Sequence, residues 1–347
     1  MDNVPGGEEG GGIMAQVTIR EVARTAGVSP ATVSRVLNTS ETVSPDLKER
    51  VLAAVRDLGY RPNSQARSLR TRATTVLGVI ISDVTNPFFT AMVRGVEDVA
   101  SAAGYSVVLA NADEDLRKEQ RYLEVAAAEQ MAGVLLSPAS ATETSIDVLA
   151  ERGIPVVTID RRLKSADVDW VMVDNHRAAK EATLHLVEQG CRRIGFIAGR
   201  LGTTTGAGRL AGYRAGLRAA GLPSARELVV SGEFRIDGGR EATERLLALP
   251  DRPDGLFVSN NLMTIGAVDA LDTAGVRFPD DIALVGFDDM MPALSLRSQI
   301  TAVSQPTYEI GRQATELLLR RVSGEPFPER HITLNAELKV RESSIRA

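Results

Sequence analysis

Residues 17–72 read VTIREVARTAGVSPATVSRVLNTSETVSPDLKERVLAAVRDLGYRPNSQARSLRTR, and this stretch contains three short segments whose apolar residues recur at helical spacing. Thr18 precedes the first segment and Glu21 follows three positions later, which predicts a capping box. In that motif the hydroxyl and the carboxylate each accept a hydrogen bond from a free backbone N–H at the helix start. Gly27 is expected to end this helix, because glycine adopts left-handed backbone angles without strain.

A second helix is expected to begin just after the turn at Gly27. Ser29 can cap it, and Pro30 suits its first position, where no backbone N–H is needed. A helix, a tight glycine-containing turn and a second helix form the helix-turn-helix pattern, and a third amphipathic segment covers residues 45–58. The apolar residues expected to form the small core are Ile19, Val22, Ala23, Ala26, Val33, Val36, Leu37, Val51, Leu52, Val55 and Leu58.

The local charge favours a nucleic acid as the partner of this stretch. Residues 14–75 carry ten basic and five acidic side chains, a net charge of plus five, in a chain whose formal charge is −5. A basic island in an acidic protein is the electrostatic footprint of phosphate contact. The alternative is a solvated three-helix domain that binds another protein.

Two motifs in this stretch resemble those of a known family. TIREVARTAGVSPATVSRVLN (18–38) is similar to the DNA-binding headpiece of the LacI/GalR family of bacterial repressors, and YRPNSQARSLRT (60–71) is similar to its hinge helix. The resemblance covers roughly residues 16–342. It implies a transcriptional regulator, in this family a repressor, that binds double-stranded DNA at a near-palindromic operator as a homodimer.

The resemblance also implies which residues contact DNA. It places the N-terminal half of the second helix in the major groove, where Arg35 is the best candidate for a bidentate contact to guanine. Pro30 and Ala31 stand where relatives often carry larger polar residues, which weakens base readout at those two positions. The DNA-contacting candidates are Thr18, Ser29, Pro30, Ala31, Thr32, Ser34, Arg35 and Asn38 in the headpiece, and Asn63, Ala66, Arg67 and Leu69 in the hinge.

The hinge is expected to fold only when it is docked. Asn63 can cap a helix that ends at Leu69 or Arg70, and a helix this short does not persist alone in water. The resemblance implies that Leu69 and its copy in the dimer wedge into the minor groove and kink the duplex. The alternative is that Leu69 packs on the following domain.

The chain divides into four expected regions. Residues 1–15 are rich in glycine and glutamate and are expected to be disordered, and Met14 is an alternative start. Residues 16–61 form the helix-turn-helix domain and residues 62–75 the hinge helix and linker. Residues 76–347 form the effector-binding and dimerisation domain, with a first lobe over about 76–174 plus a C-terminal crossover and a second lobe over about 175–305.

From residue 76 onward, apolar runs of strand length alternate with helical segments. This rhythm predicts parallel sheets covered on both faces, hence an α/β fold with two lobes that divide near Asp174. The family's effector domain, which resembles periplasmic binding proteins, has the same architecture. The expected strands lie at 76–82, 105–111, 133–137, 154–160, 193–199, 254–259, 282–288 and 300–305, and the expected helices at 88–103, 116–129, 177–189, 208–220, 238–249, 262–273 and 306–322.

A ligand site is expected between the lobes, beyond the carboxyl ends of the strands. Most of the candidates stand in the loops that follow strands, although each could instead be a helix cap or turn residue. The resemblance implies that Phe89 and Phe234 cover the ligand, Thr205 lines the pocket, Arg209 holds polar groups, and Asn260 and Asp288 hydrogen-bond hydroxyls or ring nitrogens. The full set of effector-binding candidates is Phe88, Phe89, Ser137, Asp160, Arg161, Thr205, Arg209, Phe234, Asn260 and Asp288.

Arginine donors beside carboxylate and amide acceptors suit a sugar, since each sugar hydroxyl both donates and accepts. Thr203 stands where purine-responsive relatives carry an arginine, which favours a sugar over a purine. Trp170 could stack on a sugar face or serve in packing. Ligand binding is expected to reorient the lobes and so move the hinges of the dimer, with induction and corepression both open, as is a phosphoprotein corepressor.

Other classes of protein fit less well. No motif supplies a catalytic set or a cofactor site, and Cys191, His176, His185 and His331 show no metal-ligand spacing, so no metal is expected. A nucleotide-using enzyme would need G-x-G-x-x-G or G-K-[ST], and residues 202–208 match neither. A transport protein would need a secretion signal instead of a headpiece. A single cysteine and the lack of a long apolar run fit a cytoplasmic protein at the nucleoid, with no membrane partner. No leucine heptads follow Arg341, so a tetrameric coiled coil is not expected.

Overall fold

The computed structural model describes residues 17–38, 43–60, 74–289 and 300–346. The chain forms two compact units, Met1–Arg72 and Ala73–Ala347, and each is described separately. The predictions for residues 1–15 and for the hinge at 62–73 lie outside the described residues.

The first unit contains the three predicted helices, α1 (Ile19–Ala26), α2 (Pro30–Asn38) and α3 (Pro45–Asp57). The capping box is confirmed, because the Thr18 backbone N donates to Glu21 Oε2 at 2.7 Å and the Glu21 N–H points back to the Thr18 hydroxyl. Gly27 ends α1 with φ of +63°, and Ser29 Oγ accepts the Thr32 N–H at 3.1 Å. The buried core consists of Val22, Ala23, Ala26, Val33, Val36, Val51 and Ala54, whereas Ile19, Leu37, Leu52, Val55 and Leu58 are only partly buried.

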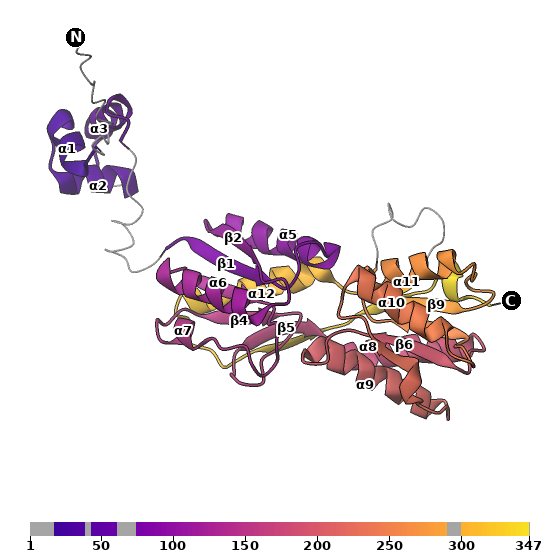
Figure 1. Cartoon of the computed structure of the whole chain (residues 1–347). Helices are drawn as coiled ribbons and strands as arrows, with labels where there is room; N and C mark the ends of the chain where they lie inside the picture. The colour runs from indigo at the N-terminus through magenta and orange to yellow at the C-terminus, as the bar shows by residue number, and fades with distance from the viewer. Residues whose placement is uncertain (1–16, 39–42, 61–73, 290–299, 347) are drawn as a thin grey trace, which may run out of the picture. The chain divides into compact units, whose positions relative to one another are not determined.

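The second unit is built on two six-stranded sheets (Figure 1). The first sheet has the strand order β11-β5-β4-β3-β1-β2, with every neighbouring pair parallel. Its strands are β1 (Val76–Ile81), β2 (Ser106–Asn111), β3 (Gly133–Leu136), β4 (Val156–Ile159), β5 (Asp169–Val173) and β11 (His331–Leu334).

The second sheet has the order β12-β10-β9-β8-β6-β7 and is parallel except for the pair of β10 and β12. Its strands are β6 (Ile194–Ala198), β7 (Val229–Ser231), β8 (Gly255–Val258), β9 (Ala283–Phe287), β10 (Thr301–Ser304) and β12 (Glu337–Lys339). The strands β5, β7, β11 and β12 have no counterpart among the predicted strands.

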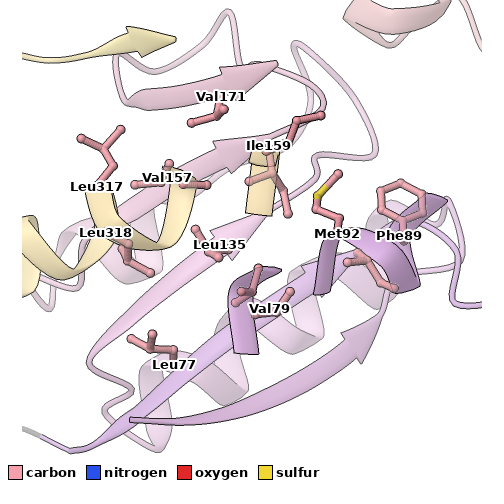
Figure 2. Packing of buried hydrophobic residues seen from close by; sticks show 14 of the residues in the cluster. Leu77, Val79, Phe89, Met92, Leu135, Val157, Ile159, Val171, Leu317 and Leu318 are labelled. Carbon is pink, nitrogen blue, oxygen red and sulfur yellow. The ribbon is translucent and has the colours of Figure 1, made fainter. Parts of the chain in front are cut away.

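Helices cover both faces of each sheet, as expected for parallel strands with apolar residues on both sides. On the first sheet, α5 (Pro87–Ala102) and α12 (Thr307–Val322) cover one face, and α6 (Leu116–Ala128) and α7 (Asp147–Ala150) cover the other. Figure 2 shows Leu317 and Leu318 of α12 packing over Leu135 and Val157 of the sheet. On the second sheet, α8 (Asn175–Glu188) and α9 (Thr204–Ala219) lie opposite α10 (Ile236–Leu247) and α11 (Asn261–Thr273).

Glycines bring helices within each lobe into backbone contact. A Cβ on Gly311 of α12 would lie 2.1 Å from the Met92 carbonyl oxygen of α5. A Cβ on Gly212 of α9 would lie 2.2 Å from the His176 carbonyl oxygen of α8. These distances leave no room for a side chain, so each helix pair packs as a tight block.

The described chain passes between the two sheets after β5, after β10 and again after β11. The first passage is at Asp174, which caps α8 through the Arg177 N–H. The Arg177 side chain donates to Asn335 Oδ1 at 2.7 Å, which ties the first passage to the third. The carboxyl ends of the central strands of both sheets face the gap between the lobes, where polar loops meet.

Candidate functional site

The carboxyl ends of the strands open into a pocket that takes residues from both lobes. The space between its lining atoms is about 360 Å³, including the solvent at its opening. Its lining residues are Asp83, Asn86, Phe88, Phe89, Glu114, Asp160, Arg161, Thr205, Arg209, Phe234, Asn260 and Asp288.

All of the effector-binding candidates except Ser137 line this pocket. Ser137 is fully buried, and its hydroxyl lies 3.1 Å from that of Ser82, so it connects the end of β3 to the end of β1. Glu114, which the sequence analysis did not select, contributes a carboxylate from the loop after β2.

On the first lobe, the buried arginine that lines the pocket is Arg161. Both terminal nitrogens of Arg161 donate to Glu114, at 2.8 Å and 2.6 Å, and Nη1 also donates to the Pro138 carbonyl oxygen. The Arg161 Nε lies 3.5 Å from Asp160 Oδ2 without a hydrogen bond. Burial raises the pKa of the Asp160 carboxyl from its ordinary value of 3.8 to about 6, although Arg161 opposes the shift.

On the second lobe, the buried arginine that lines the pocket is Arg209. Its guanidinium lies 3.6 Å above the Phe287 ring, and it donates to Asn175 Oδ1 at 2.7 Å and to the Ser259 carbonyl oxygen at 2.6 Å. Asp288 Oδ2 is 3.7 Å away. Burial lowers the pKa of Arg209 and raises the pKa of Asp288, because both charged forms have left water.

One buried polar atom of a pocket-lining residue, the donor Arg161 Nε, has no hydrogen-bond partner among the described residues. Behind the lining, the Gln305 side chain donates its amide nitrogen to Asp288, and its buried Oε1 has no partner among the described residues. Leaving buried polar groups unpaired is unfavourable unless something else satisfies them. Asp160, Phe234 and Asp288 also have φ between +62° and +69°, and such strain in non-glycine residues concentrates at binding sites.

Contacts beside the pocket join the lobes to each other. The Asn261 side chain donates to Asn86 Oδ1 at 2.9 Å, and Asn86 itself lines the pocket. Arg235 reaches across to Asp113 at 3.0 Å and to Asp83 at 3.8 Å. Since Arg235 follows Phe234 directly, the Phe234 ring that lines the pocket and the cross-lobe ion pairs belong to one segment.

In the first unit, Ser29, Pro30, Ala31 and Arg35 are exposed along α2, and Thr32 and Ser34 are half-buried. The last residue of α2 is the candidate Asn38. The candidate Thr18 stands before α1, where its hydroxyl donates to Glu21 at 2.9 Å. Arg50 is one of the ten basic residues of the stretch 14–75. Its Nη2 donates to the Ala26 carbonyl oxygen at 2.6 Å, which is a contact within the unit. The hinge candidates Asn63, Ala66, Arg67 and Leu69 lie outside the described residues.

Other residues that the sequence singled out lie away from the pocket. Trp170 stacks on His331 with ring centroids 4.9 Å apart, on the paired strands β5 and β11, so its described contact is packing. His185 Nε2 is 2.7 Å from Ser344 Oγ, and Cys191 is fully buried. Among the described residues, no cluster of His, Cys, Asp and Glu is suited to a metal ion, and no helix has the length and apolarity to cross a bilayer.

A helix-turn-helix unit followed by a two-lobed α/β unit with a polar pocket defines a class of bacterial transcriptional regulator. The family model described as bacterial regulatory proteins, lacI family, matches residues 18–63, and the periplasmic binding protein-like domain matches residues 183–344. The chain belongs to the LacI family of transcriptional regulators.

Similarity to individual members of this family extends over most of the chain. The ribose operon repressor of Halalkalibacterium halodurans is 38% identical over 94% of this chain and 97% of its own length. Catabolite control protein A of Priestia megaterium is 34% identical over 94% of this chain and 99% of its length. A solved complex of the transcriptional regulator CelR with cellobiose is 34% identical, with a TM-score of 0.72 over 94% of this chain and all of that one. These relatives are regulators and not enzymes.

Proposed function

We propose that the protein is a repressor that binds a near-palindromic operator as a homodimer and is controlled by a sugar bound between its lobes. The observation that carries the sugar assignment is the set of buried donors and acceptors that line the pocket, including Arg161 Nε, which has no partner among the described residues. Sugar hydroxyls supply a donor and an acceptor from one atom, which suits such a mixed set.

Aromatic and apolar surface supports the same ligand class. Phe88 and Phe89 come from the first lobe, where their rings meet edge to face, and Phe234 comes from the second. Flat rings facing a pocket with polar walls suit the apolar face of a sugar ring. Two of the relatives described above carry ribose or cellobiose in their names, which favours a carbohydrate for this chain as well.

Control of DNA binding follows if the sugar binds one arrangement of the lobes more tightly than another. The contacts of Asn86 with Asn261 and of Arg235 with Asp83 form only when the lobes are close. A sugar that favours this arrangement shifts the lobe equilibrium. The sugar is an inducer if the close arrangement separates the hinges of the dimer. It is a corepressor if the close arrangement brings the hinges together.

The test combines a ligand screen with a DNA-binding assay. Thermal shift of the full-length protein against sugars, polyols and nucleosides identifies the ligand, and an electrophoretic shift on the DNA upstream of its own operon measures the response. Asp288→Ala should abolish the response and leave basal operator binding intact. Asp269→Ala is the matched control, because that half-exposed carboxylate pairs with Arg240 on the surface.

Equal loss of operator binding and of the sugar response in Asp288→Ala would show that Asp288 is structural. Indifference of the wild-type protein to every sugar, with a clear response to another class of metabolite, would overturn the sugar assignment.

A further inference from the structure

The charges that line the pocket do not balance. Four carboxylates line it, those of Asp83, Glu114, Asp160 and Asp288, against two guanidinium groups, those of Arg161 and Arg209. Charges interact strongly in a buried site because little water screens them. An anionic ligand would therefore meet net repulsion unless an arginine were free to receive it.

Both arginines already donate to protein acceptors, and both terminal nitrogens of Arg161 are taken. Arg209 is engaged by Asn175 and the Ser259 carbonyl oxygen, and Asp288 lies beside it. Arg161 points its two terminal nitrogens at the two oxygens of Glu114, the same fork geometry with which arginine binds a ligand carboxylate or phosphate. Glu114 thus stands where the anionic group of a ligand would otherwise bind.

We infer that Glu114 is a specificity-determining residue: by occupying the guanidinium fork of Arg161, it restricts the pocket to uncharged sugars and excludes sugar phosphates and sugar acids. This inference rests on the proposed sugar-binding function of the pocket. Glu114 lines the pocket itself, and it acts on specificity by holding the Arg161 side chain.

The position of Glu114 supports a role beyond fold stability. The residue is 7% exposed and has φ of +57°, a backbone conformation that is unfavourable for glutamate. Replacing both members of a buried ion pair with apolar residues is often neutral or stabilising, so the presence of such a pair is weak evidence for a role in stability. The Glu114 carbonyl oxygen also accepts a hydrogen bond from Arg200 of the second lobe, which places the residue where the two lobes meet.

The experiment measures binding to full-length protein by isothermal titration calorimetry. The probes are ribose, ribose 5-phosphate, glucose, glucose 6-phosphate and sulfate, and the proteins are the wild type, Glu114→Ala, Glu114→Gln and the double variant Glu114→Ala with Arg161→Met. The wild type should bind a neutral sugar and neither the matching phosphate nor sulfate. Glu114→Ala should gain affinity for sulfate or a sugar phosphate by roughly tenfold or more, the value of one charge-assisted hydrogen bond.

The double variant should lose that gain, because it lacks the guanidinium that receives the anion. Tighter binding of a sugar phosphate than of its neutral sugar by the wild type would overturn the inference, and this measurement needs no variant to fold. Unchanged anion affinity in folded Glu114→Ala and Glu114→Gln would overturn it as well. If no sugar of the thermal-shift screen binds the wild type, the proposed function fails, whereas the sulfate titrations still decide the role of Glu114.

Discussion

Replacing Asp160 with asparagine should stabilise the ligand-free protein at neutral pH. The Asp160 carboxyl is 5% exposed, and burial raises its pKa from 3.8 to about 6. Above pH 6, this buried carboxylate therefore lowers the stability of the folded protein, because it stays ionised where little water solvates it. A shift of about two pKa units corresponds to about 3 kcal/mol, which is the upper limit of the expected gain.

The effect has a defined pH window. Between about pH 4 and pH 6 the folded protein holds the Asp160 proton more tightly than the unfolded chain does, so the contribution of Asp160 to stability falls as the pH rises. Below about pH 4 both states are protonated, and Asp160→Asn should equal the wild type. Above pH 6 the full difference should be present.

Urea unfolding of the wild type and Asp160→Asn at pH 5, 6 and 7.5, without sugar, measures this difference. Asp269→Asn is the control, because its half-exposed side chain pairs with Arg240 at the surface and does not line the pocket. A variant that is less stable than the wild type at pH 7.5, or a difference that does not shrink at pH 5, would refute the reasoning. The stabilised variant should bind sugar more weakly, because an amide is a poorer acceptor than a carboxylate.

Three further changes test other parts of the structure. Arg35→Ala should relax the preference for one base pair in each half-site, as read by selection from a randomised operator library, whereas a uniform loss of affinity would identify a phosphate contact. Arg235→Gln should weaken sugar binding by roughly two- to fivefold in low salt and by less in high salt, because its cross-lobe ion pairs are partly exposed; calorimetry at two salt concentrations measures this. Gly212→Ala should destabilise the second lobe by about 1–3 kcal/mol in urea, because its Cβ would overlap the α8 backbone, whereas Gly202→Ala, with open space around it, should not.

Local sequence patterns predicted the strands that are buried on both faces of a sheet. The strands β1, β3, β6, β8 and β9 are buried on both faces and appear in the sequence as apolar runs. β11 alternates exposed and half-buried residues, and β12 has three residues, ELK. Their identity as strands depends on pairing with β5 and β10, which no local signal shows.

The sequence allowed the prediction of those pocket residues that directly follow a strand. Asp160, Arg161 and Asp288 follow strands directly, and the structure brings them together. Ser137 also follows a strand, but its hydroxyl contacts that of Ser82 at the end of the neighbouring strand and does not line the pocket. Glu114 lies in an acidic loop next to the cap of α6, where a carboxylate looks like a solvated surface group. Only the fold brings it to an arginine that is 47 positions away in the chain.

Trp170 is the only tryptophan in the chain, and its indole stacks on His331 where β5 pairs with β11. Intrinsic fluorescence will therefore come from one edge of the first sheet. During unfolding, the emission will report when β11 detaches from β5. A spectral change on adding a sugar would report motion relayed through the sheet, since the fluorophore does not line the ligand pocket.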